Sequence, residues 1–151
     1  MDEVTLPKNK AFEFLEHTAD VYVAAYGRTL EDAFGNAALA MVETMTEIKK
    51  IEPKIQDTIE VKAEDQYGLL YSWLENLLIK FEVEEKLYSK FSVQKIKRAP
   101  EGYILKAKAS GEIFNPKKHI SKVGIKAVTY HQMEIIKEKD GSYVVKFILD
   151  I

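Results

Sequence analysis

The closing stretch of the chain, IKAVTYHQMEIIKEKDGSYVVKFILDI (residues 125–151), decides the fold that we expect. Two alternating, β-branched segments flank Asp140-Gly141, and this dipeptide between such segments is typical of a tight β-hairpin turn. If these two residues form the loop, Lys139 faces Ser142, and a four-residue loop gives the same register. The sequence therefore predicts that the chain closes with a long antiparallel ribbon.

The register of this hairpin also predicts a polar pair near its open end. Counting back from the turn pairs Met133 with Ile148 and His131 with Asp150. Directly opposed side chains of an antiparallel pair share one face, with Cβ atoms about 4.5–5.5 Å apart. Burying an imidazole and a carboxylate is costly unless both are paired or bound. Either a structural ion pair between them or a metal ion bound by both would meet this requirement. The carboxylate of the C-terminal residue, Ile151, would lie beside this pair.

Length and composition restrict the class of protein. We expect one domain spanning residues 1–151, with 46% hydrophobic and 30% charged residues as in ordinary globular proteins. The absence of cysteine excludes disulfides, thiolate zinc sites and a cysteine nucleophile. No apolar run approaches the roughly 18 residues of a membrane span, and the first residues lack the plan of a signal peptide. We therefore expect a cytoplasmic protein without membrane association.

Charge is distributed unevenly along the chain although the net charge is only −2. Residues 1–85 hold 8 Lys/Arg against 18 Asp/Glu, whereas residues 86–126 hold 11 against 2. Two readings explain this asymmetry: the two parts attract one another in the fold, or the basic part contacts RNA or an acidic partner.

Hydrophobic periodicity predicts two helices among about seven or eight strands. The first helix covers residues 30–45 after an N-cap at Thr29, and the second runs from a cap at Asp65 to about Glu85. Gly35 lies within the first helix, where glycine costs up to about 1 kcal/mol relative to alanine. Its presence despite this cost favours close packing at that point. Strands are expected at residues 11–15, 21–26, 58–63, 91–96 and 103–110, followed by a loop at 111–119 and the closing hairpin.

This order of elements predicts an α+β protein. We expect two helices packed on one side of a largely antiparallel or mixed β-sheet, forming a two-layer single domain.

The motifs of several enzyme classes are absent from the sequence. It contains neither a phosphate-binding glycine loop nor a dinucleotide fingerprint, and no Gly-x-Ser-x-Gly nucleophile elbow. Candidate chemistry is therefore restricted to the three histidines and nearby carboxylates such as Asp20 and Asp150. Carboxylate oxygens with one imidazole nitrogen suit Mg²⁺, Mn²⁺, Ca²⁺ or Zn²⁺ and do not choose among them.

Five segments, taken together and in order, resemble the archease family. They are His17-Thr18-Ala19-Asp20-Val21, the helix with Ala37-Ala38, the stretch from Leu69-Leu70 to Trp73-Leu74, Lys126-Ala127-Val128-Thr129-Tyr130-His131, and Leu149-Asp150-Ile151. The resemblance covers essentially the whole chain. It implies an archease-like α+β domain that is not itself an enzyme.

The resemblance implies a partner and a metal site. The partner is the GTP-dependent, RtcB-type tRNA-splicing ligase, whose guanylylation and multiple turnover archease-like proteins promote. The implied metal ligands are Asp20, His131 and Asp150, and the carboxylate of Ile151 is a further candidate, with calcium, magnesium or manganese as the ion. His17 would support or join the site.

The sequence departs from the family pattern at two positions that bear on this site. Asn115 stands before Pro116 where an aspartate is common, and Gly124 stands where a glutamate is common. We retain Asn115 as a further candidate for support or ligation. Both departures reduce the negative charge that the site can offer to a metal ion.

Two further hypotheses follow from the resemblance and the charges. The family also implies a chaperone-like role toward a tRNA cytosine methyltransferase, or an RNA-binding module with a structural metal. Contact with tRNA is expected to be indirect or weak, and the candidate contacts are Lys95, Lys97, Arg98, Lys117 and Lys118. A self-contained metal-dependent hydrolase ranks lowest, because only His17 or Glu16 lies close enough in sequence to act as a general base.

Overall fold

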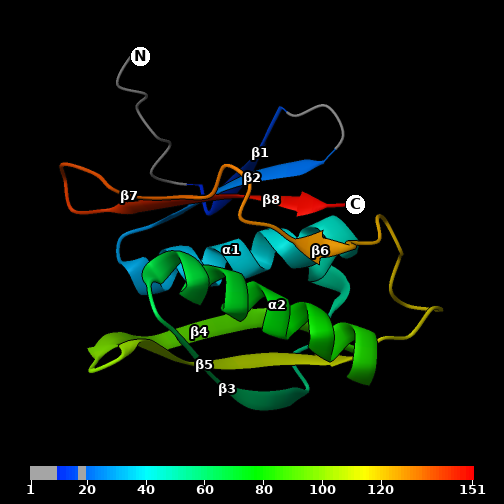
Figure 1. Ribbon diagram of the computed structural model, residues 1–151. Coiled ribbons are helices and arrows are strands. Elements are labelled where there is room, and N and C mark those ends of the chain that lie inside the picture. The colour runs from blue at the N-terminus through cyan, green and yellow to red at the C-terminus, as the bar shows by residue number, and fades with distance from the viewer. Residues whose placement is uncertain (1–9, 17–19) are drawn as a thin grey trace.

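Two helices lie between two antiparallel sheets in the computed structural model, which describes residues 10–16 and 20–151 (Figure 1). The larger sheet, sheet A, contains β1 (Phe12–Leu15), β2 (Val21–Gly27), β8 (Tyr143–Asp150), β6 (Ala127–Val128) and β7 (Glu134–Lys137), and the last two both pair with β8. Sheet B has the order β3 (Ile55–Ala63), β5 (Gly102–Ile113), β4 (Lys86–Ala99). The helices are α1 (Leu30–Met45) and α2 (Gln66–Glu84), and a short 3₁₀ helix, η1 (Ile48–Lys50), follows α1.

The α1 helix explains why there are two sheets. Of its 16 residues, 11 are buried, and they cover more than half of the helix circumference. A helix with so broad an apolar surface must be covered on more than one side, and α1 packs against β2 and β8 of sheet A and against β4 of sheet B. The predicted α+β class is confirmed, and the single sheet of that prediction is divided into two sheets with the helices between them.

Local signals placed both helices correctly. The Thr29 hydroxyl oxygen accepts a hydrogen bond from the Asp32 backbone N–H at 3.0 Å, as expected for an N-cap. The Asp65 carboxylate accepts one from the Gly68 N–H at 2.7 Å at the start of α2. The two helices are joined through the core by Trp73, whose indole N–H donates to the Phe34 carbonyl at 2.9 Å.

The predicted register of the closing hairpin is wrong by one residue. Lys137 pairs with Tyr143, and Glu134 pairs with Lys146. The turn is longer than a two-residue loop, because Gly141 adopts a positive φ of 91° and the Glu138 N–H donates to the Ser142 carbonyl. A three-residue hairpin loop with glycine in a left-handed conformation shifts the pairing in this way.

The predicted cross-strand pairing of His131 with Asp150 is therefore also wrong. Asp150 pairs with Ala127 of β6, and His131 lies in an exposed turn between β6 and β7. The Met133 N–H closes this turn on the Tyr130 carbonyl, and Gln132 adopts a positive φ of 53°. The turn interrupts the ribbon, so that β6 and β7 pair with β8 in different registers.

None of the helices in residues 10–16 and 20–151 is long and apolar enough to cross a membrane.

The expected close packing at Gly35 is wrong. A Cβ atom at this position would have its nearest neighbours, on Phe91 and Val93, at 3.9 Å. That distance is an ordinary van der Waals contact.

We predict that Gly35→Ala stabilises the protein by about 0.5–1 kcal/mol, because alanine favours the helix and fills available space without a clash. Chemical denaturation should show a higher midpoint with an unchanged slope. The matched control is Gly27→Ala, where the new Cβ would lie 2.2 Å from the Ala33 nitrogen and should destabilise the fold. A lower midpoint for Gly35→Ala would contradict the prediction.

Candidate metal centre and charged surfaces

Two predicted site residues meet at one end of sheet A. Strands β2 and β8 pair with Val21 opposite Leu149, and Asp20 and Asp150 are the residues that directly adjoin this last pair. Val23 and Phe147 belong to the core on the helix side of the sheet. By the alternation of strand side chains, Asp20 and Asp150 lie on the opposite face. Segments from the two ends of the chain thus bring two carboxylates to neighbouring positions.

The chemistry of this pair suits a hard divalent cation. Neighbouring carboxylates repel one another, and a cation held between them would offset that repulsion. Asp150 ends β8 and is followed by Ile151, the further candidate ligand, and carboxylate oxygens are the ligands that Ca²⁺, Mg²⁺ and Mn²⁺ prefer. Over residues 10–16 and 20–151, however, no three side chains of His, Cys, Asp or Glu gather closely enough to hold a metal ion.

The histidines have different surroundings from those predicted. His131 is exposed, and its backbone N–H donates to the Thr129 hydroxyl oxygen at 3.2 Å. His17 lies outside the described residues, so its predicted supporting role stays a prediction. Gly124 lies in an exposed segment with no atom within 4 Å of a built Cβ, so a longer side chain there would project into open space.

A polar cluster that the sequence analysis did not predict lies where β5 continues beyond its expected end. The side chains of Glu112 and His119 are buried, and His119 Nε2 lies 2.9 Å from a Glu112 carboxylate oxygen. His119 Nδ1 accepts from the Asn115 backbone N–H at 2.8 Å, so Nε2 is the nitrogen that donates to Glu112. The Asn115 side chain accepts from the Lys117 N–H at 3.0 Å and thus stabilises this turn.

Hydrogen bonds hold the pKa of Glu112 far below its ordinary value. Burial alone would raise this pKa, but donors from Lys118, the Glu52 backbone N–H and His119 outweigh burial and lower it to about 2. Lys118 Nζ lies 2.8 Å from Glu112 and also contacts the Glu52 carboxylate. The cluster fastens the loop after β5 to the segment that follows η1.

We predict that this cluster makes the fold sensitive to acid. The depressed pKa of Glu112 contributes stability that is complete above its unfolded value near 4.5 and is lost as the pH falls toward 2. Glu112→Gln should cost about 2–3 kcal/mol at neutral pH, since the acceptor of this buried network loses its negative charge. Thermal melts from pH 7 to pH 2.5 should show the two proteins converging. An equal difference at every pH would contradict this assignment.

The five predicted RNA or partner contacts lie in three different places. Lys95 and Lys97 are exposed on the outer face of sheet B, the face away from the helices. Arg98, the next residue on β4, lies on the opposite face, and its guanidinium is 5.6 Å from the Tyr103 ring centroid. Lys117 is exposed in the loop after β5, and Lys118 is held by its two carboxylates. Whether any of them contacts RNA stays a prediction.

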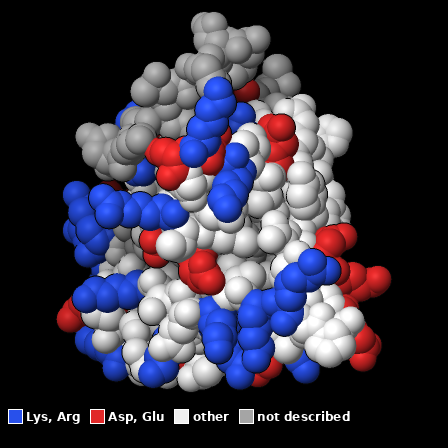
Figure 2. Space-filling model, turned by 90° about the vertical axis from the view of Figure 1, so that its left-hand side faces the viewer, with Lys and Arg blue, Asp and Glu red and all other residues white. Residues whose placement is uncertain are grey.

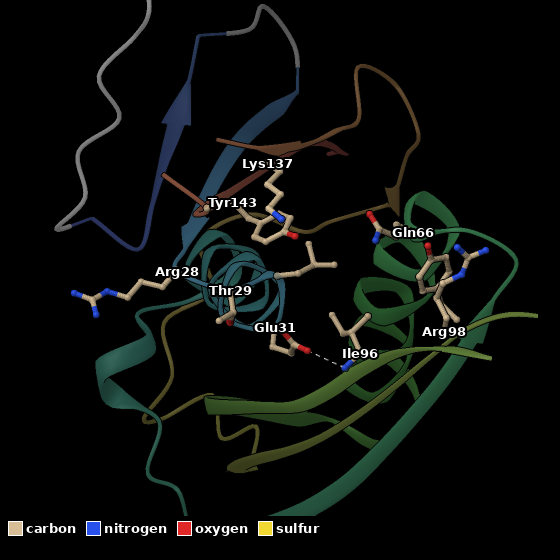
Figure 3. A pocket seen from close by; sticks show the side chains of 11 residues that line it. Arg28, Thr29, Glu31, Gln66, Ile96, Arg98, Lys137 and Tyr143 are labelled. Carbon is tan, nitrogen blue, oxygen red and sulfur yellow. Dashed lines mark hydrogen bonds between the residues drawn. The ribbon is translucent and has the colours of Figure 1, made fainter. Parts of the chain in front are cut away.

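Arg98 lines a cavity of about 430 Å³ between the first turns of the helices and the two hairpin ends (Figure 3). Glu31 fixes one wall, because its carboxylate accepts a hydrogen bond from the Ile96 N–H at 3.1 Å. In Figure 3, Lys137 and Tyr143 lie on the opposite wall, and Arg28 turns away from the cavity. Figure 2 shows this end of the molecule, with Lys and Arg side chains numerous along its lower part, where sheet B lies.

This cavity is separate from the pair of carboxylates. Tyr143 begins β8 and Asp150 ends it. At about 3.4 Å per residue, the two ends of the strand are roughly 24 Å apart. Chemistry at Asp20 and Asp150 therefore does not involve the cavity.

The fold and the paired carboxylates define a small α+β protein with a candidate oxygen-ligand metal site. The model of the archease protein family matches residues 12–151. Relatives named protein archease are 46% identical in Sulfolobus acidocaldarius, over 93% of this chain and 98% of the relative, and 44% identical in Thermococcus kodakarensis, over 94% and 99%.

Solved structures agree with this match. The solution structure of Methanobacterium thermoautotrophicum protein 1598 is 39% identical and superimposes with a TM-score of 0.80, over 93% of this chain and 99% of that one. A Thermotoga maritima crystal structure described as an archease, possible chaperone, shares the fold with a TM-score of 0.55 at 17% identity, over 91% and 94%. The chain belongs to the archease family.

Proposed function

We propose that this protein is an accessory factor of a GTP-dependent, RtcB-type RNA ligase and that it promotes guanylylation and multiple turnover of that ligase. Membership of the archease family supports this role. The single observation that supports the proposal is the register of β2 and β8, whose last pair, Val21–Leu149, is directly adjoined by Asp20 and Asp150.

The proposed site holds a divalent cation through Asp20, Asp150 and the carboxylate of Ile151. A bound cation would supply positive charge that neutralises or orients charge developing on a phosphoryl group of the partner. The role of this chain's own residues is to hold three carboxylate groups together at the end of a sheet, on a strand that is paired along both edges. His131 stays a predicted ligand whose exposed turn lies outside the strand pairing.

We expect the wild-type protein to raise guanylylation of its matched ligase, measured as incorporation of labelled GTP with Mn²⁺ or Mg²⁺. Asp150→Asn should lose most of this stimulation. Calorimetric titration should show affinity for Ca²⁺, Mg²⁺ or Mn²⁺ reduced about tenfold or more in Asp20→Asn and Asp150→Asn, since even supporting partners of metal ligands are worth that much.

The matched control is Glu101→Gln, which removes an exposed carboxylate in the turn between β4 and β5 and should leave stimulation unchanged. His131→Gln decides whether that residue belongs to the ligand set. Absence of stimulation by the wild-type protein would overturn the role. Full stimulation by a folded Asp150→Asn variant would overturn the site and leave the role standing.

A chaperone-like action on a tRNA cytosine methyltransferase is a second candidate function, favoured by exposed aliphatic side chains at one end of the molecule. Val83 near the end of α2 is 74% exposed, and Ile113 and Ile120 are each 51% exposed. The Phe114 N–H donates to the Glu85 carbonyl at 2.7 Å, which joins the end of β5 to the end of α2. Apolar side chains grouped in this way favour contact with another protein.

For this second function we expect the double variant Val83→Ser/Ile120→Ser to suppress aggregation of the methyltransferase several-fold less than the wild type, as measured by light scattering. Phe14→Ser, which removes an exposed aromatic ring from β1, is the control and should behave like the wild type. Equal suppression by all three proteins would exclude this surface.

A further inference from the structure

The outer face of sheet B carries an array of lysines that the sequence alone does not reveal. Cross-strand partners share a face of a sheet. Strand β5 pairs with β3 on one side and with β4 on the other, so each outward residue of β5 has one partner on each neighbouring strand. Four such rows of three residues, here called rungs, make up the array. The rungs are Lys62–Ile104–Lys97, Glu60–Lys106–Lys95, Thr58–Lys108–Ser92 and Gln56–Ser110–Lys90. A hydrogen bond of 3.4 Å from the Gln56 amide to the Ser110 hydroxyl lies within the last rung.

Positive charge dominates this face. Each of its six lysines is exposed, and within residues 10–16 and 20–151 none of them forms an ion pair. Glu60 is the one carboxylate on the four rungs. With strands about 4.8 Å apart and alternate residues about 6.7 Å apart, the array is about 10 Å wide and about 20 Å long.

The stability of the sheet does not explain the array. Lys95 lies directly opposite Lys106, and like charges at opposed positions destabilise a sheet. Lysines on edge strands protect against aggregation, but Lys106 and Lys108 lie on β5, the central strand. Glu60 on β3 is opposite Lys106 and offsets only part of this repulsion, and an external partner that supplies negative charge would relieve the rest.

The composition of the face favours a nucleic-acid backbone over a protein. Protein interfaces are depleted of lysine and are built around aromatic, methionine and arginine side chains, and the four rungs contain none of these. Lysine is suited to contacts with phosphate, which give affinity without reading sequence. The rungs also lack an aromatic ring on which a base would stack.

We infer that the outer face of sheet B binds the phosphate backbone of RNA directly, independently of base sequence, through Lys62, Lys90, Lys95, Lys97, Lys106 and Lys108. This inference goes beyond the proposed function, which requires no RNA contact by this chain. Only Lys95 and Lys97 of these six were among the contacts predicted from sequence. The missing signal is the pairing of β5 with both neighbours, which brings lysines from three strands onto one face.

Fluorescence anisotropy with a labelled RNA stem-loop tests the inference without the ligase. Between about 50 and 200 mM NaCl, the logarithm of the association constant should fall linearly with that of the salt concentration. Lys95→Gln/Lys106→Gln/Lys108→Gln should reduce the magnitude of this slope by about 2–3 and weaken binding roughly 10- to 100-fold at 0.1 M salt. Its melting temperature should be unchanged or higher, because Lys95 and Lys106 no longer repel.

The control with the same change in charge is Lys49→Gln/Lys137→Gln/Lys139→Gln, which removes exposed lysines outside sheet B and should bind RNA like the wild type. The pair Lys62→Gln/Lys97→Gln tests the array on a different rung. The inference is overturned by no RNA binding at low salt, by equal weakening in control and array variants, or by polyglutamate displacing RNA as well as unlabelled RNA does. Ligase stimulation is a separate assay, so either proposal can fail alone.

Discussion

The broad buried surface of α1, which covers more than half of the helix circumference, is the constraint on which the rest of the structure depends. A helix rich in alanine allows close approach, and its apolar surface requires cover from both sheets. Sheet A supplies this cover through β2 and β8, whose pairing brings Asp20 and Asp150 together. Sheet B supplies it through β4, and the buried face of that sheet leaves its other face free to carry charge. The two candidate surfaces are thus consequences of one core.

Elements whose signals are local could be predicted from the sequence. The caps at Thr29 and Asp65 act within one helical turn, so the starts of both helices were predicted correctly. The hairpin was located by Asp140-Gly141, but its register depends on the backbone conformation of Gly141, which composition does not determine. One residue of slip was enough to separate His131 from Asp150.

Features that depend on pairing between distant strands could not be predicted in the same way. The meeting of Asp20 and Asp150 was implied by resemblance alone, and the physical cause is the register of β2 against β8. The lysine array requires two registers at once, because its rungs draw on β3, β4 and β5. The cluster at Glu112 was missed because β5 continues three residues beyond the last predicted strand residue, Ser110.

The fold accounts for part of the uneven charge along the chain by ion pairing, and contact of the remaining basic residues with RNA stays a proposal. Some of the basic segment pairs with the acidic part: Lys86 contacts Asp57 at 3.1 Å, and Lys122 contacts Glu43 at 2.5 Å. The lysines of the array make no such contacts with the part of the chain that the structure describes, and they lie on the side of sheet B that faces away from the helices. Asp20 and Asp150 lie on the face of sheet A that faces away from the helices in the opposite direction (Figure 1). A polyanion bound to the array would thus be separated from the carboxylates by the full thickness of the molecule. Its negative charge would compete little with a cation there, because screening by salt is effective beyond about 8–10 Å.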